Sequence, residues 1–503
     1  MDTNILSIPI LILLPLIAAG IIASPLLYNN SIFTRRFAKG FSILHFFYAS
    51  MFFLLNTTNK SLLTFGTSNS HEPYLTSRIP LLDNAILHQI GIHVTFSLDN
   101  LSILMVILTT LVFTITIVAA KLFIKEHIKM FYSLIFILES ILLMIFTTND
   151  MFVFFTLWEL ELIPMYFLIS MWGNKNAKAS ATKFVLYTFG GSLFLLLGIL
   201  LIYYTNFATS GVFSADINQI SFLTKNPLIQ IIISVLLLIG FGVKIPIVPM
   251  HRWLADAHTD AITPVSMILA AILLKLGVYG LIRFNMQILP LGFTILAPII
   301  GILAIVNIIY GAMLAYNQKN IKKVVAYSSI SQMGIILLGI ATLNQIAYIG
   351  SVFHMISHAL VVMGLFMIVG IVKQRFKTHN MKRLSGIASV MPRLYGFSVL
   401  ISLAAIGIPF LSGFIGEFLN IYGAFNSVMS IFKLFALITV AVLVLSALYI
   451  LNLIHEIFMG SIPEKYKHVQ DIAVHEFLVL SAISLLIVIL GCCPFVIINF
   501  LSP

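Results

Sequence analysis

The stretch WELELIPMY, residues 158–166, places two carboxylates inside a segment that otherwise avoids charge. Glu159 and Glu161 are the only charged residues in the apolar run 151–172. An ionisable side chain at the centre of a membrane span costs about 2.5–3.5 kcal/mol on insertion scales, so it marks a functional site by default. What the two carboxylates face depends on whether this run crosses a membrane.

The composition is that of an integral membrane protein. Hydrophobic residues make up 60% of the 503 residues and charged residues only 9%, far from the balance of soluble domains. Apolar runs of about 20 residues, long enough to cross a bilayer as a helix, recur along the whole chain. We therefore expect an all-α polytopic membrane protein. The 14 predicted spans lie near 4–24, 40–56, 98–120, 130–147, 151–172, 184–204, 226–249, 262–282, 291–316, 324–342, 347–372, 394–423, 434–457 and 474–500.

The placement of the positive charges supports these spans. A net charge of +11 could indicate a nucleic-acid partner, since clustered Lys and Arg neutralise phosphates. However, of the 28 lysines and arginines, 21 fall in connections on one side of the predicted spans and five on the other. This asymmetry follows the positive-inside rule. It predicts that both termini lie on the outer side, and it argues against a nucleic-acid partner.

The cysteines give no sign of a cofactor or metal site. Cys492 and Cys493 are adjacent in the last span, so they offer neither a disulfide framework nor a Cys-x-x-Cys metal spacing. Glycine-rich phosphate loops and His/Cys clusters are also missing from the sequence. We expect no cofactor and no metal on this chain.

The seventh span carries a lysine beside a predicted helix break. Lys244, in IGFGVKIPIVPMHRW, is followed by Pro246 and Pro249, which disrupt helical hydrogen bonding. A broken helix in a membrane is tolerated where it packs in protein or lines a hydrated cavity. A buried lysine there suits a proton carrier. The alternative is a lysine permanently paired with a glutamate, holding two helices together.

The twelfth span repeats this pattern with the opposite charge. Glu417 lies in AIGIPFLSGFIGEFLNIYG, where glycines and a proline again indicate a break. The two breaks are offset by five spans, and an odd number of crossings inverts a repeated unit, as in ion-translocating folds. The distance from Lys244 to Glu417 is 173 residues, as is that from Glu159 to Gln332. A central lysine, Lys275 in LAAILLKLGVYG, also needs an internal partner or water.

Two histidines lie in the eleventh span. His354 and His358, in VFHMISHALVVMG, are one helical turn apart and share a face. Packed hydrogen-bonding residues and members of a proton relay are both compatible with that spacing. Imidazole suits a relay because it titrates near neutral pH.

Together these residues resemble the antiporter-like membrane subunits of proton-pumping NADH:quinone oxidoreductase, respiratory complex I, and within that family its chain M, or chain 4, branch. The resemblance extends from FSLDNLS at 96–102 through the thirteenth span. The motifs that carry it are WELELIPMYFLISMWG, KIPIVPMHRWLADAHTDAITPVS, ILLKLGVYGLIRF, KKVVAYSSISQMG, MISHALVVMGLF and GIPFLSGFIGEF.

The resemblance implies 14 helices with two inverted five-helix repeats and breaks in helices 7 and 12. Applied to this chain, it predicts four parts. They are 1–128 with helices 1–3, 129–286 with the first repeat, 287–458 with the second repeat, and 459–503 with helix 14.

The resemblance also implies which residues move protons. The helix 5 glutamate that pairs with the helix 7 lysine corresponds to Glu159, and the lysine to Lys244. The central lysine is Lys275, the helix 11 histidine His358, and the terminal acidic group Glu417. That last match favours chain M, because the sister subunits usually carry lysine there.

Four residues depart from the family pattern or lie outside it. Gln332 stands where the family often has histidine, so it cannot titrate and would need water. Glu161 lies about 200° around a helix from Glu159, so we expect it to face a neighbouring helix or subunit. His354 and Glu139 have no carried-over role.

We therefore predict a proton-translocating subunit without redox chemistry of its own. The complex would use NADH, flavin, iron–sulfur clusters and quinone on other subunits, and the partners would be membrane-arm subunits, including sister antiporter-like chains, within a lipid bilayer. The alternatives are a multi-subunit Na+/H+ antiporter, an energy-converting hydrogenase or a structural scaffold. We expect a bacterial plasma (inner) membrane, with a thylakoid or mitochondrial inner membrane as alternatives.

Overall fold

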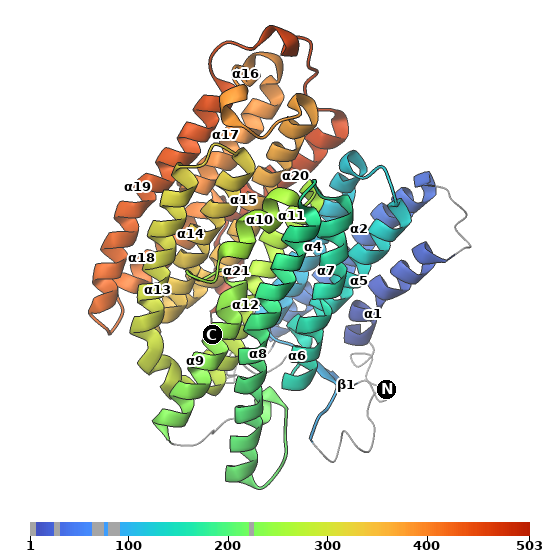
Figure 1. The fold of residues 1–503 in the computed structure, drawn as a ribbon. Coiled ribbons are helices and arrows are strands. Elements are labelled where there is room, and N and C mark those ends of the chain that lie inside the picture. Colours follow the sequence, from blue (N-terminus) through green and yellow to red (C-terminus); the bar gives the residue numbers. More distant parts are fainter. Residues whose placement is uncertain (1–6, 25–30, 63–74, 79–90, 221–225, 503) are drawn as a thin grey trace.

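The chain forms a bundle of long helices that run in roughly a common direction, as the computed structural model shows (Figure 1). The structure describes residues 7–24, 31–62, 75–78, 91–220 and 226–502. Within these ranges, 12 helices are long and apolar enough to cross a membrane, and two shorter apolar helices, Ile8–Ala23 and Pro392–Ile406, occupy two further predicted spans. All 14 predicted spans are thus helical, which confirms a polytopic membrane protein.

The first part of the chain builds the first eight spans. In chain order its elements are α1 (Ser7–Ala23), α2 (Ser31–Leu62), β1 (Leu75–Arg78), β2 (Thr95–Leu98), α4 (Asn100–Phe123), α5 (Ile128–Thr147), α6 (Met151–Leu160), α7 (Leu162–Trp172), α8 (Ala177–Ser210), η2 (Ile217–Gln219), α9 (Pro227–Lys244), α10 (Arg252–Asp260), α11 (Thr263–Ile268), η3 (Leu269–Leu273), α12 (Leu274–Gly280) and η4 (Leu281–Met286). The two strands pair antiparallel, with Leu75 opposite Leu98 and Arg78 opposite Thr95.

The second part builds the other six spans. Its elements are α13 (Pro290–Tyr316), α14 (Ile321–Ala341), α15 (Gln345–Phe376), η5 (Met381–Arg383), α16 (Ile387–Val390), α17 (Pro392–Ile406), α18 (Ser412–Phe425), α19 (Ile431–Phe458), η6 (Glu464–Tyr466), α20 (Val474–Cys492) and α21 (Phe495–Leu501).

The helices at the centre of the bundle are α14, α15 and the continuous run from α11 to η4. Nearly all residues of these helices are buried inside the chain, whereas α8, α19 and α20 leave most of their residues at the surface. α15 packs against α14, α18, α11 and α20, and α13 packs against α14, α9 and α19. The helices α1 and α2 lie at one edge of the bundle and α19 at the other (Figure 1). The central helices are therefore the ones shielded from lipid.

Short polar side chains fix the starts of several spans. Asp150 accepts hydrogen bonds from the backbone N–H groups of Phe152 (2.8 Å) and Val153 (3.0 Å) at the start of α6. Asn320 and Asn344 cap α14 and α15 in the same way. Such caps satisfy backbone donors that a helix start leaves unpaired. The sequence positions of these caps therefore set where each span begins.

The predicted break in the seventh span is present and is stabilised by a neighbouring helix. α9 ends at Lys244, and α10 begins only at Arg252. Asn307 of α13 satisfies both sides of the gap: its Oδ1 accepts from the Val248 N–H (2.8 Å), and its Nδ2 donates to the Pro246 carbonyl (3.3 Å). A buried amide thus replaces the hydrogen bonds that the prolines remove.

The predicted break in the twelfth span is also present, between α17 and α18. Gly407 ends α17 with φ +81, a conformation that a residue without a Cβ adopts readily. The carboxylate of Glu417 occupies the space where a Cβ on Gly407 would lie. Both breaks therefore lie where the sequence indicated, although the boundaries of the two inverted repeats, 129–286 and 287–458, stay a prediction.

The fifth span contains a third interruption, which the sequence analysis did not predict. α6 ends at Leu160 and α7 begins at Leu162, with Glu161 between them. Pro164 has no N–H to donate to the carbonyl of Leu160, so one helical hydrogen bond is missing at this point. The interruption lies next to the two carboxylates of WELELIPMY.

We predict that Asn307→Ala destabilises the protein, because it leaves the part-buried Val248 N–H and the buried Pro246 carbonyl of the seventh-span break unpaired. Each such group costs about 1–3 kcal/mol. The measurement is the midpoint of thermal unfolding of the detergent-solubilised protein. Asn317→Ala, at the exposed end of the same helix, is the control, and equal midpoints for the two variants would contradict the role given to Asn307.

Candidate functional site: a buried polar file

Lys244 forms a buried ion pair with Glu161 at the break of the seventh span. The ammonium of Lys244 contacts Glu161 Oε1, and the two side chains are 1% and 0% exposed. The ammonium also lies 5.2 Å from the ring centroid of Trp158 and 5.3 Å from that of Phe184. Aromatic rings stabilise a cation through their electron-rich faces, so Trp158 and Phe184 both stabilise the ammonium of Lys244.

This arrangement corrects the predicted partner of Lys244. The prediction that Glu159 pairs with this lysine is wrong, because Lys244 contacts Glu161 instead. Glu161 does face a neighbouring helix, as expected, and that helix is α9, which carries the lysine. Trp158 and Glu161 are three residues apart and share one helix face, and that face packs on α9. Glu159 lies on another face, is half-buried, and faces Ser192 of α8 while remaining within electrostatic range of Lys244. The two carboxylates lie on different faces of the helix, as expected, but Glu161 and not Glu159 contacts Lys244.

Lys275 contacts His358 at the centre of the bundle. Its ammonium lies 2.7 Å from His358 Nδ1 and donates to the Ala270 carbonyl at 2.8 Å. Both side chains are buried. Lys275 lies on α12, between the π-helical turns η3 and η4, and such turns occur frequently at functional sites. An ammonium can only donate, so a charged Lys275 requires Nδ1 of His358 to be an acceptor.

A second set of contacts leads from His354 to Glu417. His354 Nε2 lies 2.7 Å from Gln332 Oε1, and Gln332 Nε2 donates to Glu417 Oε1 at 3.0 Å. The amide oxygen only accepts, so His354 Nε2 carries a hydrogen. Gln332, which was expected to need water, contacts its neighbours directly. The sequence analysis set both His354 and Gln332 aside, although the shared face of His354 and His358 was visible in their spacing.

A small cavity joins the two sets of contacts. The rings of His354 and His358 are 6.4 Å apart. Both line a cavity of about 20 Å³ together with Gln332, Glu417 and Tyr449. That is room for about one water molecule. Three of the predicted site residues, Lys275, His358 and Glu417, are thus brought together within one file of polar groups.

His258 is a further buried imidazole, which the sequence analysis missed. It lies on α10, directly after the seventh-span break, and is 0% exposed. Its ring stacks on Phe366 at 5.0 Å, and neither ring nitrogen has a hydrogen-bond partner in the described part of the chain. Lys275 and Lys322 are within electrostatic range. Its position in KIPIVPMHRWLADAHTDAITPVS was the only available signal, because α10 lies outside the predicted spans.

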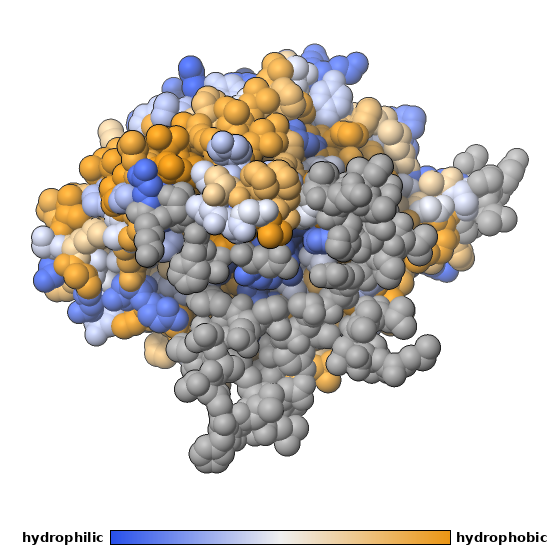
Figure 2. All heavy atoms as spheres, turned by 90° about the horizontal axis from the view of Figure 1, so that it is seen from below, coloured by the Kyte–Doolittle hydropathy of each residue, from blue (hydrophilic) through white to orange (hydrophobic). Residues whose placement is uncertain are grey.

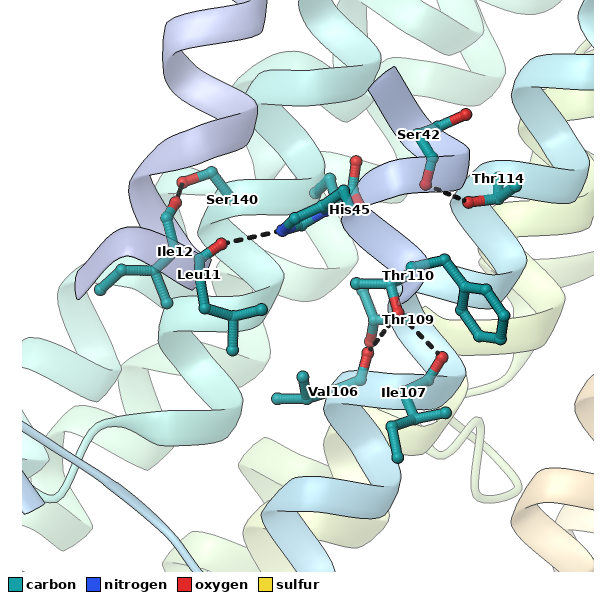
Figure 3. Close-up of polar contacts among 12 residues, drawn as sticks. Leu11, Ile12, Ser42, His45, Val106, Ile107, Thr109, Thr110, Thr114 and Ser140 are labelled. Atoms are coloured by element: carbon teal, nitrogen blue, oxygen red, sulfur yellow. Dashed lines mark hydrogen bonds and ion pairs between the residues drawn. The ribbon is translucent and has the colours of Figure 1, made fainter. Parts of the chain in front are cut away.

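Glu139, left without a role by the sequence, pairs with His45 away from this file. His45 Nδ1 lies 3.0 Å from Glu139 Oε1, and His45 Nε2 lies 3.0 Å from the Leu11 carbonyl (Figure 3). Pro15 has no N–H for that carbonyl, so the imidazole replaces the missing helical bond and Nε2 must carry a hydrogen. The pair joins α1, α2 and α5, which places Glu139 at the edge of the bundle.

A many-span helical protein with a file of buried lysines, histidines and acids belongs to the class of membrane proteins that translocate protons or other cations. A family model described as NADH:quinone oxidoreductase/Mrp antiporter, TM, matches residues 148–446. NAD(P)H-quinone oxidoreductase chain 4 2 of Thermosynechococcus vestitus is 38% identical over 456 residues, covering 90% of this chain and 81% of that protein. The chain belongs to this NAD(P)H-quinone oxidoreductase chain 4 family.

Two solved structures share the fold. A chain of respiratory complex I from Thermus thermophilus with bound NADH has a TM-score of 0.83 at 24% identity and covers 98% of both chains. A chain of the Mrp complex from Dietzia sp. has a TM-score of 0.83 at 19% identity, covering 100% of this chain and 96% of that one. The fold is therefore common to both kinds of complex.

We predict that Glu161→Gln lowers respiration-driven proton uptake into inverted membrane vesicles about tenfold or more, and that Glu159→Gln lowers it less. Glu161→Gln leaves Lys244 without its contacting carboxylate, and breaking a buried ion pair typically costs about 3–5 kcal/mol. Native gels would check that both variants assemble. A larger loss for Glu159→Gln would show that the contact seen in this structure is not the one that matters.

Proposed function

We propose that this chain is a proton-translocating membrane subunit of an NADH:quinone oxidoreductase. The observation that carries the proposal is the set of buried contacts Glu161–Lys244, Lys275–His358 and His354–Gln332–Glu417 inside the bundle. Each ionisable group in it costs several kcal/mol to bury. A structural scaffold would gain nothing from repeating that cost at several buried sites.

The redox chemistry belongs to partner subunits in this proposal. Electrons pass from NADH, or a related donor, through flavin and iron–sulfur clusters to quinone, all held outside this chain. The name of the relative supports that division, because it describes one chain of an NAD(P)H-quinone oxidoreductase. The neighbours of this chain are then other membrane subunits, including sister antiporter-like chains, and the signal for translocation arrives sideways through the membrane.

Translocation begins at the Glu161–Lys244 pair. Separating the carboxylate from the ammonium leaves a buried, unpaired cation, which favours loss of the proton by the lysine. Glu161 lies at the interruption between α6 and α7, and Lys244 at the end of α9. Both groups are therefore attached where the helices lack a regular hydrogen bond, so a small backbone shift can change their distance.

The released proton has a buried route onward. His258 lies on α10, which follows the seventh-span break, and is within electrostatic range of Lys275 and Lys322, so we propose that it takes part in passing the proton to Lys275. From Lys275 the route continues through its contact with His358, a water in the small cavity and His354. Gln332 cannot titrate, so the step to Glu417 requires either rotation of its amide or the same water.

The Na+/H+ antiporter alternative cannot be decided by the fold, since the Mrp chain and the complex I chain have equal TM-scores. Two observations favour the oxidoreductase. The relatives at 38% identity are named as oxidoreductase subunits, and the terminal group of the file is an acid, Glu417, where sister subunits usually carry lysine.

We also propose that the membrane in which this chain lies is a bacterial plasma membrane. The named relative comes from Thermosynechococcus vestitus, a cyanobacterium, and this makes a thylakoid membrane the leading alternative. Fractionation of the two membranes with an antibody to this chain would decide between them.

We predict that Lys275→Ala lowers NADH-driven quinone reduction and proton uptake together, each by about tenfold or more, because the central step of the file is lost. Lys465→Ala, at an exposed position, is the control. Both rates would be measured in the same vesicles, with assembly checked. If electron flow and proton uptake persist while Na+/H+ exchange is lost, the chain is an antiporter subunit instead.

We also predict that Gln332→Leu lowers proton uptake per NADH oxidised several-fold, since it removes both hydrogen bonds between His354 and Glu417. Gln332→His restores a polar, titratable group of similar reach and should retain most of the uptake. Similar uptake by the Leu and His variants would mean that protons do not pass between His354 and Glu417.

A further inference from the structure

A cavity of about 440 Å³ lies at the end of the bundle where α4 and α15 begin, the end that the Lys/Arg bias predicts to face the outer side. Polar and apolar residues line it in about equal parts. It is lined by Asp99 and Arg283 together with Gln287, Gln345 and Tyr348. At about 30 Å³ per water molecule in the liquid, it holds a cluster of more than ten. Hydrophilic residues are visible near the centre of the molecule when it is seen from below (Figure 2). The mechanism proposed above makes no use of this vestibule.

The floor of the vestibule is a set of hydrogen bonds around one guanidinium. Arg283 Nη2 lies 2.6 Å from Asp99 Oδ2 and donates to Ser102 Oγ at 2.8 Å. Arg283 Nε donates to the Tyr279 hydroxyl at 3.1 Å, and that hydroxyl donates to the Phe146 carbonyl at 2.9 Å. These contacts join η4, α12, the start of α4 and the end of α5. The floor is therefore a closed plug and not a set of loose side chains.

The plug lies next to the central lysine, Lys275, further along the same span. Lys275, Tyr279 and Arg283 follow one another at intervals of four residues along a single continuous span, so they lie on neighbouring turns of one face. Four residues of helix rise about 6 Å. In this structure the Lys275 ammonium points away from the plug, toward Ala270 and His358. The polar file and the outer vestibule are separated.

The electrostatics of the plug suit a barrier to protons. Asp99 contacts the Arg283 guanidinium and accepts a hydrogen bond from the Ser102 N–H, and both contacts stabilise its charged form. Asp99 is then a carboxylate, and Arg283 stays charged at any physiological pH. A fixed guanidinium in a narrow passage repels hydronium, a device known from other membrane pores.

We propose that the vestibule is the outer aqueous exit for protons from Lys275, and that Tyr279, Arg283 and Asp99 form its gate, closed in this structure. The inference rests on the proposed function, since it needs Lys275 to carry a proton. It adds an outlet on the outer side at the middle of the file, besides the end of the file at Glu417.

Release through this gate needs two movements. The Lys275 side chain turns from Ala270 and His358 toward Tyr279, one turn further along its own helix. The guanidinium of Arg283 moves aside with Asp99, so that water from the vestibule reaches the lysine. The ammonium then gives its proton to water, leaving a neutral amine and a hydronium ion in the vestibule. Arg283 and Tyr279 are positioning residues here, because neither has to gain or lose a proton.

The first test of the gate is thiol accessibility, in membranes in which Cys492 and Cys493 are replaced by serine. A membrane-impermeant thiol reagent is added from the outer side. Gln345→Cys, in the vestibule, should be labelled, and Ala304→Cys, buried in α13, should not. Ser102→Cys lies behind Arg283; it should resist labelling with Arg283 present and become labelled when combined with Arg283→Gln. An unlabelled Gln345→Cys, or a Ser102→Cys labelled without any change at Arg283, would overturn the proposal.

The second test is coupling. In proteoliposomes, Arg283→Gln should raise the passive proton leak several-fold and lower the protons moved per NADH oxidised, whereas Arg283→Lys, which keeps the charge, should restore both toward the native values. Arg393→Gln, at an exposed inner position, is the control. If Lys275→Ala abolishes pumping but Arg283→Gln leaves the leak unchanged, the gate is wrong and the proposed function stands. If Lys275→Ala has no effect, the proposed function itself fails.

Discussion

A charge placed in the low-dielectric interior of this bundle must have a partner, and the rest of the structure depends on how those partners are supplied. Lys244 has Glu161, Lys275 has His358 and a backbone carbonyl, and Arg283 has Asp99. Glu161, His358 and Asp99 each come from a different span than the cation that they contact. The packing of the central helices is therefore fixed by polar pairs as well as by apolar contact, and breaking a pair changes both charge and packing.

The irregular backbone of the spans lies at these same charges. Lys244 ends α9 at the proline-rich break, Glu161 separates α6 from α7, and Lys275 lies between two π-helical turns. Glu417 fills the space beside Gly407 in the twelfth-span break. A regular helix satisfies all of its own backbone groups in lipid. At the breaks some of these backbone hydrogen bonds are missing. The carbonyls and side chains there can therefore move relative to one another, which a translocating site requires.

The fold does not by itself choose between the functions open to this architecture. Chains from a respiratory complex and from an Mrp complex match it equally well, so the choice rests on particular side chains. Here these are Glu417, the acid at the end of the file, and Gln332, which hydrogen-bonds both His354 and Glu417 but cannot titrate. The shared fold supplies the arrangement of the helices, and the side chains set which groups can carry a proton.

Sequence alone was enough to determine the spans, the breaks in the seventh and twelfth spans and the location of Lys244, Lys275, His358 and Glu417 within spans. Hydropathy, proline and the Lys/Arg bias are local signals, so they can be interpreted without knowing any contact. Only the tertiary structure decided that Glu161, and not Glu159, meets Lys244, that Gln332 links His354 to Glu417, and that Arg283 closes a vestibule with Asp99. Those contacts join residues 83, 85 and 184 positions apart in the chain. They depend on how each helix is rotated about its own axis, which large buried side chains such as Trp158 set through packing, and no spacing within one helix specifies that rotation.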